Sequence, residues 1–344
     1  MTLAFSDIRK QIDTLQIAER FFDSLLLFNL ADLGVFAALA HGPRTLDELA
    51  TATGGHAETL RAVLDAAVAV DLLQLPEPEA EPLRYAASPA LLACLGDPES
   101  PTYLGEWMSF LGALVSPISQ VAEAVRTGIP AGSMVDGSER DNRPARAMTR
   151  AMDAYARTRG VEIAQRLPLD GVRHLLDVGC GPGSYAMAFL DANPQLHATL
   201  LDLPGPIEIA RGYVAERGLQ ARVSFAAADA LQYTPERPVD MILVSNILHM
   251  LGPERSRALL ARCFEMLQPG GRLVLQAEFL HADRRSPRWP TLLNLIMQAT
   301  TEGGRNHSVD ETSAWLAEAG FSDIEHQRLS PWNVNSVLLG WKRT

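Results

Sequence analysis

The chain has 344 residues, 47% of them hydrophobic, and a formal net charge of −11. This length exceeds one ordinary domain, so we expect two domains around a cleft. The acidic balance argues against nucleic acid or an anionic membrane surface as the partner, because both need clustered Lys and Arg. A small-molecule partner fits better.

The cysteines and the first residues indicate the compartment. Cys94, Cys180 and Cys263 lie far apart and show no CxxC or Cys/His spacing, which favours a reducing compartment and no metal site. The first residues lack a basic stretch followed by a long apolar core, and no run approaches the roughly 18 apolar residues of a membrane span. We therefore expect a cytoplasmic protein.

The first hundred residues predict a mostly helical domain. Apolar residues recur at helical spacing from Ile8 to Leu39. Around Phe21 the helix is apolar on most of its sides, as in helices that are buried, often against another subunit. Thr45 begins a capping signal before a short helix, and a second helix runs from about Ala57 to Leu73. Two short strands, at 72–76 and 83–87, complete a winged-helix pattern.

The rest of the chain changes from helical to alternating character. Ser88 and Pro89 open a mostly helical stretch that ends near Arg166, with 132–144 its most loop-like part. From His174 onward apolar strands alternate with helices, which predicts a doubly wound, Rossmann-like α/β domain. The predicted strands are HLLDVG, ATLLDL, RVSFAA, DMILVSN and RLVLQAE, then a closing antiparallel pair at 324–329 and 337–341.

These patterns divide the chain into three segments. We expect a winged-helix domain at 1–100, a helical connector that contributes to the substrate pocket at 101–168, and a cofactor-binding α/β domain at 169–344.

A glycine turn indicates a cofactor site. The strand HLLDVG leads into Gly179, Gly181 and Gly183 and then into a helix, so the backbone can approach a nucleotide-like ligand. A purely structural turn is the alternative. Asp177 stands two residues before the first glycine, where its carboxylate would repel a pyrophosphate. S-adenosylmethionine carries an ammonium and a sulfonium and no phosphate, so it fits better than NAD.

Acidic residues after the next two strands support this interpretation. Asp202, followed by Leu203, ends the next strand, where an acid in such folds accepts bonds from ribose hydroxyls. Asp229 and Ala230 follow the third strand and could bracket an adenine ring. Each aspartate could instead cap a strand or a turn, but Asp177, Asp202 and Asp229 together favour a cofactor site.

Several motifs resemble the two-domain small-molecule O-methyltransferases, of the plant caffeate, acetylserotonin and bacterial hydroxyneurosporene type. They are LLDVGCGPGSYAMAF, LDLPGPIEIAR, AADAL, NILHML and LQPGGRLVLQAEFL, and the resemblance runs nearly end to end. It implies that the N-terminal winged helix is a dimerisation domain and that the protein is a homodimer. It also implies cofactor contacts from Gly179, Asp202, Asp229 and Ala230, with Ser245 where the family often has Lys.

The resemblance extends to the acid-base residues. His249 matches the family's catalytic base, and an imidazole can take a phenolic proton near neutral pH. Glu278 matches an acid that holds this histidine, and a carboxylate there would fix the tautomer and raise the imidazole's basicity. The alternatives are a buried structural histidine and a strand-end charge.

Three departures from the family's pattern put this chemistry in question. Met250 replaces the usual Asp after the histidine, Asn294 stands near a usual Asp, and Asn306 replaces the usual Glu of GGKERT. Asn294 and Asn306 are expected to bind the substrate. His307 could compensate for the missing acids by facing the substrate, or could lie in a solvated loop.

The substrate pocket is expected to be flexible and aromatic, suited to a planar apolar molecule. Core packing is the alternative for each candidate, and the candidates are Trp107, Met108, Phe110, Met152, Trp289 and Met297.

The sequence therefore predicts a methyltransferase that acts on a small, aromatic or polyketide-like secondary metabolite at a hydroxyl oxygen and releases S-adenosylhomocysteine. Three alternatives stay open: a C- or N-methyltransferase that relies on proximity, a non-methylating protein that binds the same cofactor, and a DNA-binding regulator, whose recognition helix would offer only Arg61 and several acids.

Overall fold

The computed structural model describes residues 5–100, 102–130, 143–331 and 333–343. The chain divides into two compact units, Met1–Ala113 and Leu114–Thr344, and each is described by itself. The predicted loop at 132–144 lies almost wholly outside the described residues. Across the described ranges no single helix is long and apolar enough to cross a membrane; one bent pair, Gly105–Ser119 with Val121–Thr127, meets the length and composition criteria together.

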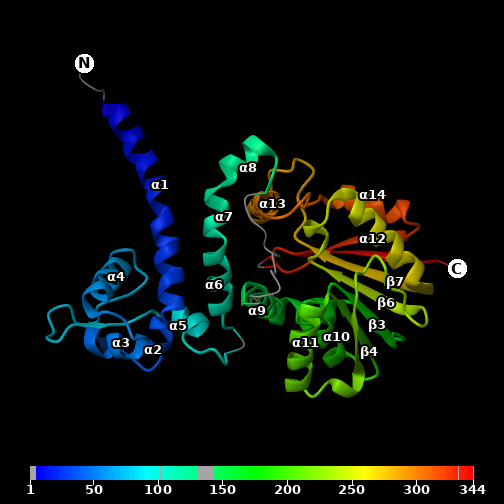
Figure 1. Ribbon diagram of the computed structural model, residues 1–344, viewed down its shortest axis with the longest axis horizontal. Coiled ribbons are helices and arrows are strands. Elements are labelled where there is room, and N and C mark those ends of the chain that lie inside the picture. Colours follow the sequence, from blue (N-terminus) through cyan, green and yellow to red (C-terminus); the bar gives the residue numbers. More distant parts are fainter. Residues whose placement is uncertain (1–4, 101, 131–142, 332, 344) are drawn as a thin grey trace. The chain divides into compact units, whose positions relative to one another are not determined.

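The first unit is mostly helical (Figure 1). Its elements are α1 (Phe5–Asp32), α2 (Val35–Leu39), β1 (Arg44–Thr45), α3 (Leu46–Thr53), α4 (Ala57–Ala69), β2 (Arg84–Tyr85), α5 (Pro89–Leu95) and α6 (Gly105–Ala113). Leu30, Phe36, Leu64 and Tyr85 form the centre of its apolar core. Much of α1 is left outside this core, and its apolar side chains there are exposed.

Local signals in this unit are largely confirmed. Thr45 and Glu48 form the predicted capping box at the start of α3, and the Ser88 side chain accepts a hydrogen bond from the N–H of Leu91 at the start of α5. The predicted helix over Ile8–Leu39 is instead two helices, because Gly34 adopts a φ of 73° between them. Of the two wing strands, the first is reduced to a single bridge between Gln74 and Ala86.

The second unit begins with three helices, α7 (Val115–Ser119), α8 (Val121–Thr127) and α9 (Arg143–Arg166), and continues as an α/β domain. Its strands are β3 (His174–Val178), β4 (His197–Asp202), β5 (Val223–Ala227), β6 (Val239–Ser245), β7 (Leu267–Ala277), β8 (Ser322–Arg328) and β9 (Ser336–Trp341). Its other helices are α10 (Ser184–Ala192), α11 (Pro204–Glu216), η1 (Gln220–Arg222), η2 (Leu248–Met250), α12 (Pro253–Met266), α13 (Arg288–Thr300) and α14 (Val309–Glu318).

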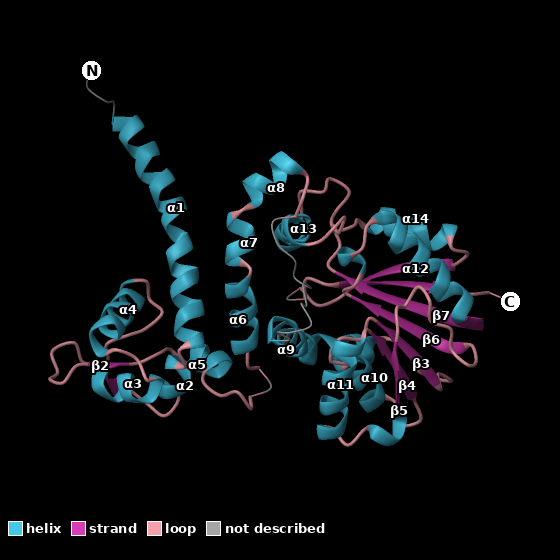
Figure 2. Ribbon diagram, viewed as in Figure 1, coloured by secondary structure: helices cyan, strands magenta, loops and turns pink. Residues whose placement is uncertain are grey.

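The strands form one seven-stranded sheet in the order β5-β4-β3-β6-β7-β9-β8 (Figure 2). The first five are parallel, whereas β9 pairs antiparallel with both β7 and β8. All predicted strands of this unit, including the closing antiparallel pair, are therefore confirmed. The strand order reverses beside β3, which is where open α/β sheets bind ligands.

Both faces of the sheet are covered by helices, because successive side chains on a strand point to opposite faces. Leu175, Leu200 and Leu243 pack with α9, α10 and α11. Their neighbours Leu176, Leu201 and Val244 pack with α12 and α14. At Gly160 the backbone of α9 approaches α10 so closely that a Cβ atom there would lie 3.2 Å from Tyr185 and 3.3 Å from Ala188. This packing places α9 directly against α10, the helix that follows the glycines after β3.

Candidate functional site

The predicted cofactor residues lie at one edge of the sheet, where the parallel strands end. Gly179 and Gly181 follow β3, Asp202 and Leu203 close β4, Asp229 and Ala230 follow β5, Ser245 ends β6, and Glu278 follows β7. Parallel strands bring their carboxyl ends to the same edge. The structure thus gathers at one edge residues that lie up to about a hundred positions apart in the sequence.

The glycine turn is tied to the end of β4. The N–H groups of Gly179 and Cys180 donate to the carbonyl of Leu201, at 2.8 and 3.2 Å. Gly179 has a φ of 69°, and a Cβ atom there would collide with Ile247. Gly183 has a φ of 79°, and its Cβ atom would lie 2.7 Å from Leu200. The turn therefore requires glycine at both positions.

Asp202 connects the turn after β3 with the turn after β4. One carboxylate oxygen accepts from the N–H of Gly181 at 2.7 Å, and the other accepts from the N–H of Leu203 at 2.7 Å. Burial raises the pKa of this carboxyl, whereas the two N–H bonds oppose the rise. The next residue, Leu203, is 50% exposed, an apolar surface that a flat ring can cover.

Asp229 holds the turn after β5. Its carboxylate accepts from the N–H of Leu231 at 2.9 Å, and its carbonyl accepts from the N–H groups of Gln232 and Tyr233. The N–H of Ala228 donates to the carbonyl of Asp202. The turns after β4 and β5 are therefore connected through their backbones.

Asp177 is a buried carboxylate without a hydrogen-bonding partner. Its side chain is 1% exposed, and neither oxygen has a hydrogen bond within the described part of the chain. Burial, followed by the nearby charge of Asp202, raises its pKa to about 8, and the nearby backbone N–H of Ala186 opposes the rise. An uncompensated buried carboxylate costs free energy, and a cationic ligand group beside it would reduce that cost.

Sequence reasoning overlooked Asn246, the residue that follows Ser245. It has a φ of 52°, a left-handed conformation that Asn tolerates better than most residues. Its amide oxygen is buried and has no hydrogen-bond partner among the described residues. The position of this Asn, between the end of a predicted strand and His249, was the sequence feature that could have identified it.

His249 lies in the short helix η2, directly after this turn. Burial, and then the positive charge of His307 when protonated, lowers the pKa of His249 to about 4. At neutral pH the imidazole is therefore uncharged and can accept a proton. Its ring makes no hydrogen bond to any residue that the structure describes.

Glu278 is paired with a residue that the sequence did not single out. Its carboxylate accepts a hydrogen bond from the hydroxyl of Tyr155 on α9, and a further interaction comes from Trp289. Burial raises the pKa of Glu278, whereas Tyr155, Trp289 and the charge of Arg159 oppose the rise. Within the described residues Glu278 makes no hydrogen bond to His249, so its predicted role in holding the imidazole stays a prediction.

The predicted substrate residues Asn294 and Asn306 form hydrogen bonds next to Glu278. The Asn306 amide donates to the carbonyls of Glu278 and Pro290, at 3.1 and 2.8 Å. The Asn306 N–H donates to the side chain of Asn294 at 2.9 Å. Both asparagines therefore hold backbone. By the resemblance, Asn306 stands where a Glu is usual and Asn294 stands near a usual Asp.

His307 does not lie in a solvated loop, because only 4% of it is exposed. Its Nε2 donates to the carbonyl of Leu248 at 3.2 Å, and its ring packs edge-on against Trp315. Burial lowers its pKa. The residue thereby supports the helix that carries His249.

The remaining pocket candidates are divided between the two units. Met152 is half-buried on α9, and Met297 on α13 is 1% exposed. Trp107 and Phe110 on α6 of the first unit pack against each other with tilted rings, whose centroids are 5.3 Å apart. Their contact with substrate stays a prediction.

A further contact connects α9 with the start of α10, directly after the glycine turn. Asp153 accepts a hydrogen bond from the hydroxyl of Ser184, the first residue of α10. It also forms an ion pair with Arg157 at 2.6 Å. Sequence gave no signal for this contact, or for Tyr155, because both depend on how α9 packs.

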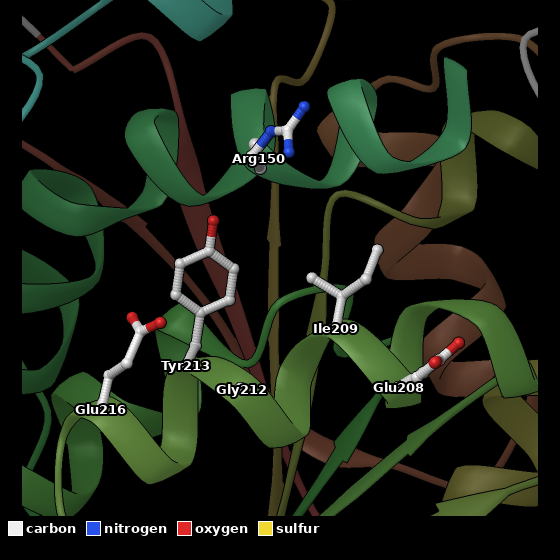
Figure 3. Close-up of a pocket in the computed structure, with 6 residues that line it drawn as sticks. All are labelled: Arg150, Glu208, Ile209, Gly212, Tyr213 and Glu216. Carbon is white, nitrogen blue, oxygen red and sulfur yellow. The ribbon is translucent and has the colours of Figure 1, made fainter. Parts of the chain in front are cut away.

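A hollow of about 290 Å³ lies between α9 and α11. The ring of Tyr213 extends from α11 toward the helix that carries Arg150 (Figure 3). The lining residues are Arg150, Glu208, Ile209, Gly212, Tyr213 and Glu216. No residue predicted for the cofactor or the substrate lines it. Among the described residues, no group of three or more His, Cys, Asp or Glu side chains could hold a metal ion.

Known proteins resemble this chain over nearly its whole length. The tetracenomycin polyketide synthesis 8-O-methyl transferase of Streptomyces glaucescens is 32% identical over 94% of this chain and 95% of its own. The aclacinomycin 10-hydroxylase of Streptomyces purpurascens is 31% identical over 85% of this chain and 79% of its own. The structure of human N-acetylserotonin methyltransferase in complex with SAM matches with a TM-score of 0.87, at 22% identity, over all of both chains.

Two sequence models of protein domains match as well. The O-methyltransferase dimerisation domain matches residues 15–93, and the O-methyltransferase domain matches residues 122–322. The second match covers more than half of the chain. The chain therefore belongs to the O-methyltransferase family.

Proposed function

We propose that this protein transfers a methyl group from S-adenosylmethionine to a hydroxyl oxygen of a small aromatic or polyketide-like metabolite. The observation that carries the proposal is the gathering of five strand-end segments at one edge of the sheet, beside the buried carboxyl group of Asp177, whose oxygens have no hydrogen bond within the described residues. The name of the polyketide-acting relative supports the class of acceptor. When bound, the cofactor supplies a methyl group on a positively charged sulfur.

The residues at the sheet edge fit this cofactor. Asp177 keeps a proton near neutral pH without ligand, and a ligand ammonium beside it would favour the ionised carboxylate and compensate its charge. Asp202 can accept from ribose hydroxyls, and exposed Leu203 offers apolar surface to an adenine ring. Asp229 and Ala230 border the same edge. A pyrophosphate would meet the carboxylates of Asp177 and Asp202, which disfavours NAD.

Proton removal is assigned to His249. Its lowered pKa keeps the imidazole neutral, so it can accept the proton of a substrate hydroxyl. A pKa of about 4 makes it a weak base, so we assign most of the rate acceleration to orientation of the hydroxyl and exclusion of water. Asn294, Met152 and Met297, with Trp107 and Phe110 of the first unit, are the proposed substrate contacts.

A second candidate function is a reaction other than methylation with the same cofactor. The observation that favours it is the 31% identity to a protein named as a hydroxylase. Asn306, which holds backbone where the family usually has Glu, and Asn294, near a usual Asp, are consistent with altered chemistry. Analysis of the product mass separates the two: methyl transfer adds one CH₂ to the acceptor.

We also propose a homodimer formed through the first unit. The exposed apolar side chains of α1 are Ile12, Leu15, Ile17, Phe21 and Phe22, and most lie inside the matched dimerisation domain. At 3.6 residues per turn these side chains lie on opposite sides of the helix, and exposed apolar surface of this extent marks an interaction site. The three-segment division at 1–100, 101–168 and 169–344 also remains a proposal.

Calorimetric titration tests the cofactor assignment. S-adenosylmethionine should bind with a micromolar Kd, and Asp202→Ala should weaken binding about tenfold or more, because it removes charged acceptors. NAD should give no heat of binding. Failure of S-adenosylmethionine to bind, or preference for NAD, would contradict the proposal.

The pH dependence of folding tests the state of Asp177. Because its pKa is raised from 3.8 to about 8, the folded protein keeps a proton that the unfolded chain releases between about pH 4 and pH 8. The free energy of unfolding of the wild type should therefore fall, relative to Asp177→Asn, by on the order of 1 kcal/mol per pH unit in this window, and level off above it. Urea titrations without cofactor measure this, and a pH-independent difference would refute it.

Turnover of the His249→Ala variant tests the base. At saturating cofactor, kcat for a phenolic acceptor should fall roughly a hundredfold or more. His197→Ala is the control and should keep wild-type turnover, because His197 is exposed and lies at the amino end of β4, away from the site edge. Near-full turnover of His249→Ala, with unchanged melting temperature, would remove the base from the mechanism.

Sedimentation tests the dimer. Replacing Phe21 and Phe22 together by Ser removes two aromatic anchors from each subunit, so the dimer dissociation constant should rise at least about 100-fold. Val125→Ser, at an exposed apolar residue outside α1, should leave the association unchanged. A monomeric wild type would contradict the homodimer.

A further inference from the structure

A chain of hydrogen bonds runs from α9 to the end of β6. The hydroxyl of Ser245 donates to Oε1 of Gln276. Nε2 of Gln276 donates to Oδ1 of Asn335. Nδ2 of Asn335 donates to Oδ1 of Asn333 at 3.0 Å, and Nδ2 of Asn333 donates to Glu162 at 3.0 Å. Every donor in this chain points away from Ser245 and toward Glu162.

The direction of the chain is fixed by its far end. An ionised carboxylate can only accept hydrogen bonds, so Asn333 must turn its NH₂ group toward Glu162. Its oxygen then faces Asn335, where it accepts from both the side chain and the backbone N–H, the latter at 3.1 Å. Asn335 must turn its NH₂ group to that oxygen, and its own oxygen faces Gln276. Gln276 is oriented in the same way toward Ser245.

Glu162 is well suited to fix this direction. It accepts from the N–H and the hydroxyl of Ser330, at 2.7 and 2.6 Å, and pairs with Arg166 at 2.9 Å. Despite partial burial, bonds from Asn333 and Ser330 and the charge of Arg166 keep its pKa below the usual range. Glu162 is therefore ionised at neutral pH and remains an acceptor.

A branch of the chain has the same direction. The second N–H of the Asn335 amide donates to the hydroxyl of Tyr155 at 3.2 Å, and Tyr155 donates to Glu278. Two carboxylates, Glu162 and Glu278, therefore accept the ends of the network. Asn333, Asn335 and Gln276 are all buried, and reversing one of them would leave buried groups unpaired.

We infer that Glu162, acting through Asn333, Asn335 and Gln276, is a positioning residue that makes Ser245 a hydrogen-bond acceptor toward the cofactor. The proton of the Ser245 hydroxyl is committed to Gln276, and the buried hydroxyl of Tyr185 lies beside both side chains. Ser245 can therefore offer a ligand only oxygen lone pairs. The ligand group that meets Ser245 must then carry a proton, as an amine, an ammonium or a ribose hydroxyl does. A phosphate or carboxylate oxygen would find no donor there.

This inference rests on the proposed cofactor, and binding of S-adenosylhomocysteine, measured by calorimetry, tests it without an acceptor substrate. Ser245→Ala should raise the Kd about tenfold, because it removes a buried acceptor. Glu162→Gln, which introduces a donor at the anchor, should raise the Kd about fivefold. In the Ser245→Ala background, Glu162→Gln should change the Kd less than about twofold, because the effect reaches the ligand through Ser245.

A matched control is Asp240→Asn. Asp240 also accepts three hydrogen bonds, from the N–H groups of Arg173 and His174 and from Gln268, but it lies near the amino end of β6. This variant should lose stability and keep the wild-type Kd. If Glu162→Gln does not fold, Gln276→Leu replaces it, since it also frees the Ser245 proton.

The outcomes separate the two proposals. A wild type that does not bind S-adenosylhomocysteine refutes the proposed function. A wild type that binds it, with Glu162→Gln or Gln276→Leu binding equally well, overturns the inference. If the two substitutions together raise the Kd by the product of their separate factors, Glu162 acts by a route other than Ser245. That result would also overturn the inference.

Discussion

The hydrogen bonds that tie the glycine turn to the end of β4 are the constraint on which the site depends. The N–H groups of Gly179, Cys180 and Gly181 are all directed at Leu201 or Asp202. They bring the turn after β3 and the turn after β4 together at the point where the strand order reverses. Ile247 packs against Gly179 at the same point. The backbone itself, more than any side chain, forms the edge that a ligand would meet.

The edge of the sheet contains buried carboxyl groups, and their burial costs free energy of folding. The charge of Asp202 lies close enough to raise the pKa of Asp177, and neither oxygen of Asp177 has a hydrogen bond within the described residues. Proteins tolerate such groups where a ligand compensates them. Around the edge the structure supplies rigid support: Asp153 holds Ser184, Asn306 holds the backbone at Glu278, and His307 holds the carbonyl of Leu248. Stability lost at Asp177 is thus offset by polar contacts that keep the surrounding segments in place.

The sequence revealed the architecture of this edge better than its chemistry. Strand periods, the Thr45 capping box and the glycine turn depend on residues close in sequence, so each was predictable. Tyr155, Asn335 and Glu162 could not be found in this way. Tyr155 bonds Glu278 and Asn335, 123 and 180 positions away, and Glu162 bonds Ser330 and Asn333, 168 and 171 positions away. The Gly34 break was missed because the apolar period continues through it, and the weak first wing strand because its apolar residues pack on helices instead.

Asparagine at positions where the family has acids has a physical meaning in this chain. A carboxylate at 306 could accept hydrogen bonds but could not donate to the carbonyls of Glu278 and Pro290, whereas the Asn306 amide donates to both. The same rule governs Asn333 and Asn335: an amide that both donates and accepts can pass a direction from one neighbour to the next, and a carboxylate can only end the series. The buried polar groups of this site are therefore divided into carboxylates that set a direction and amides that transmit it. Ser245 is the point at which that direction reaches the cofactor edge.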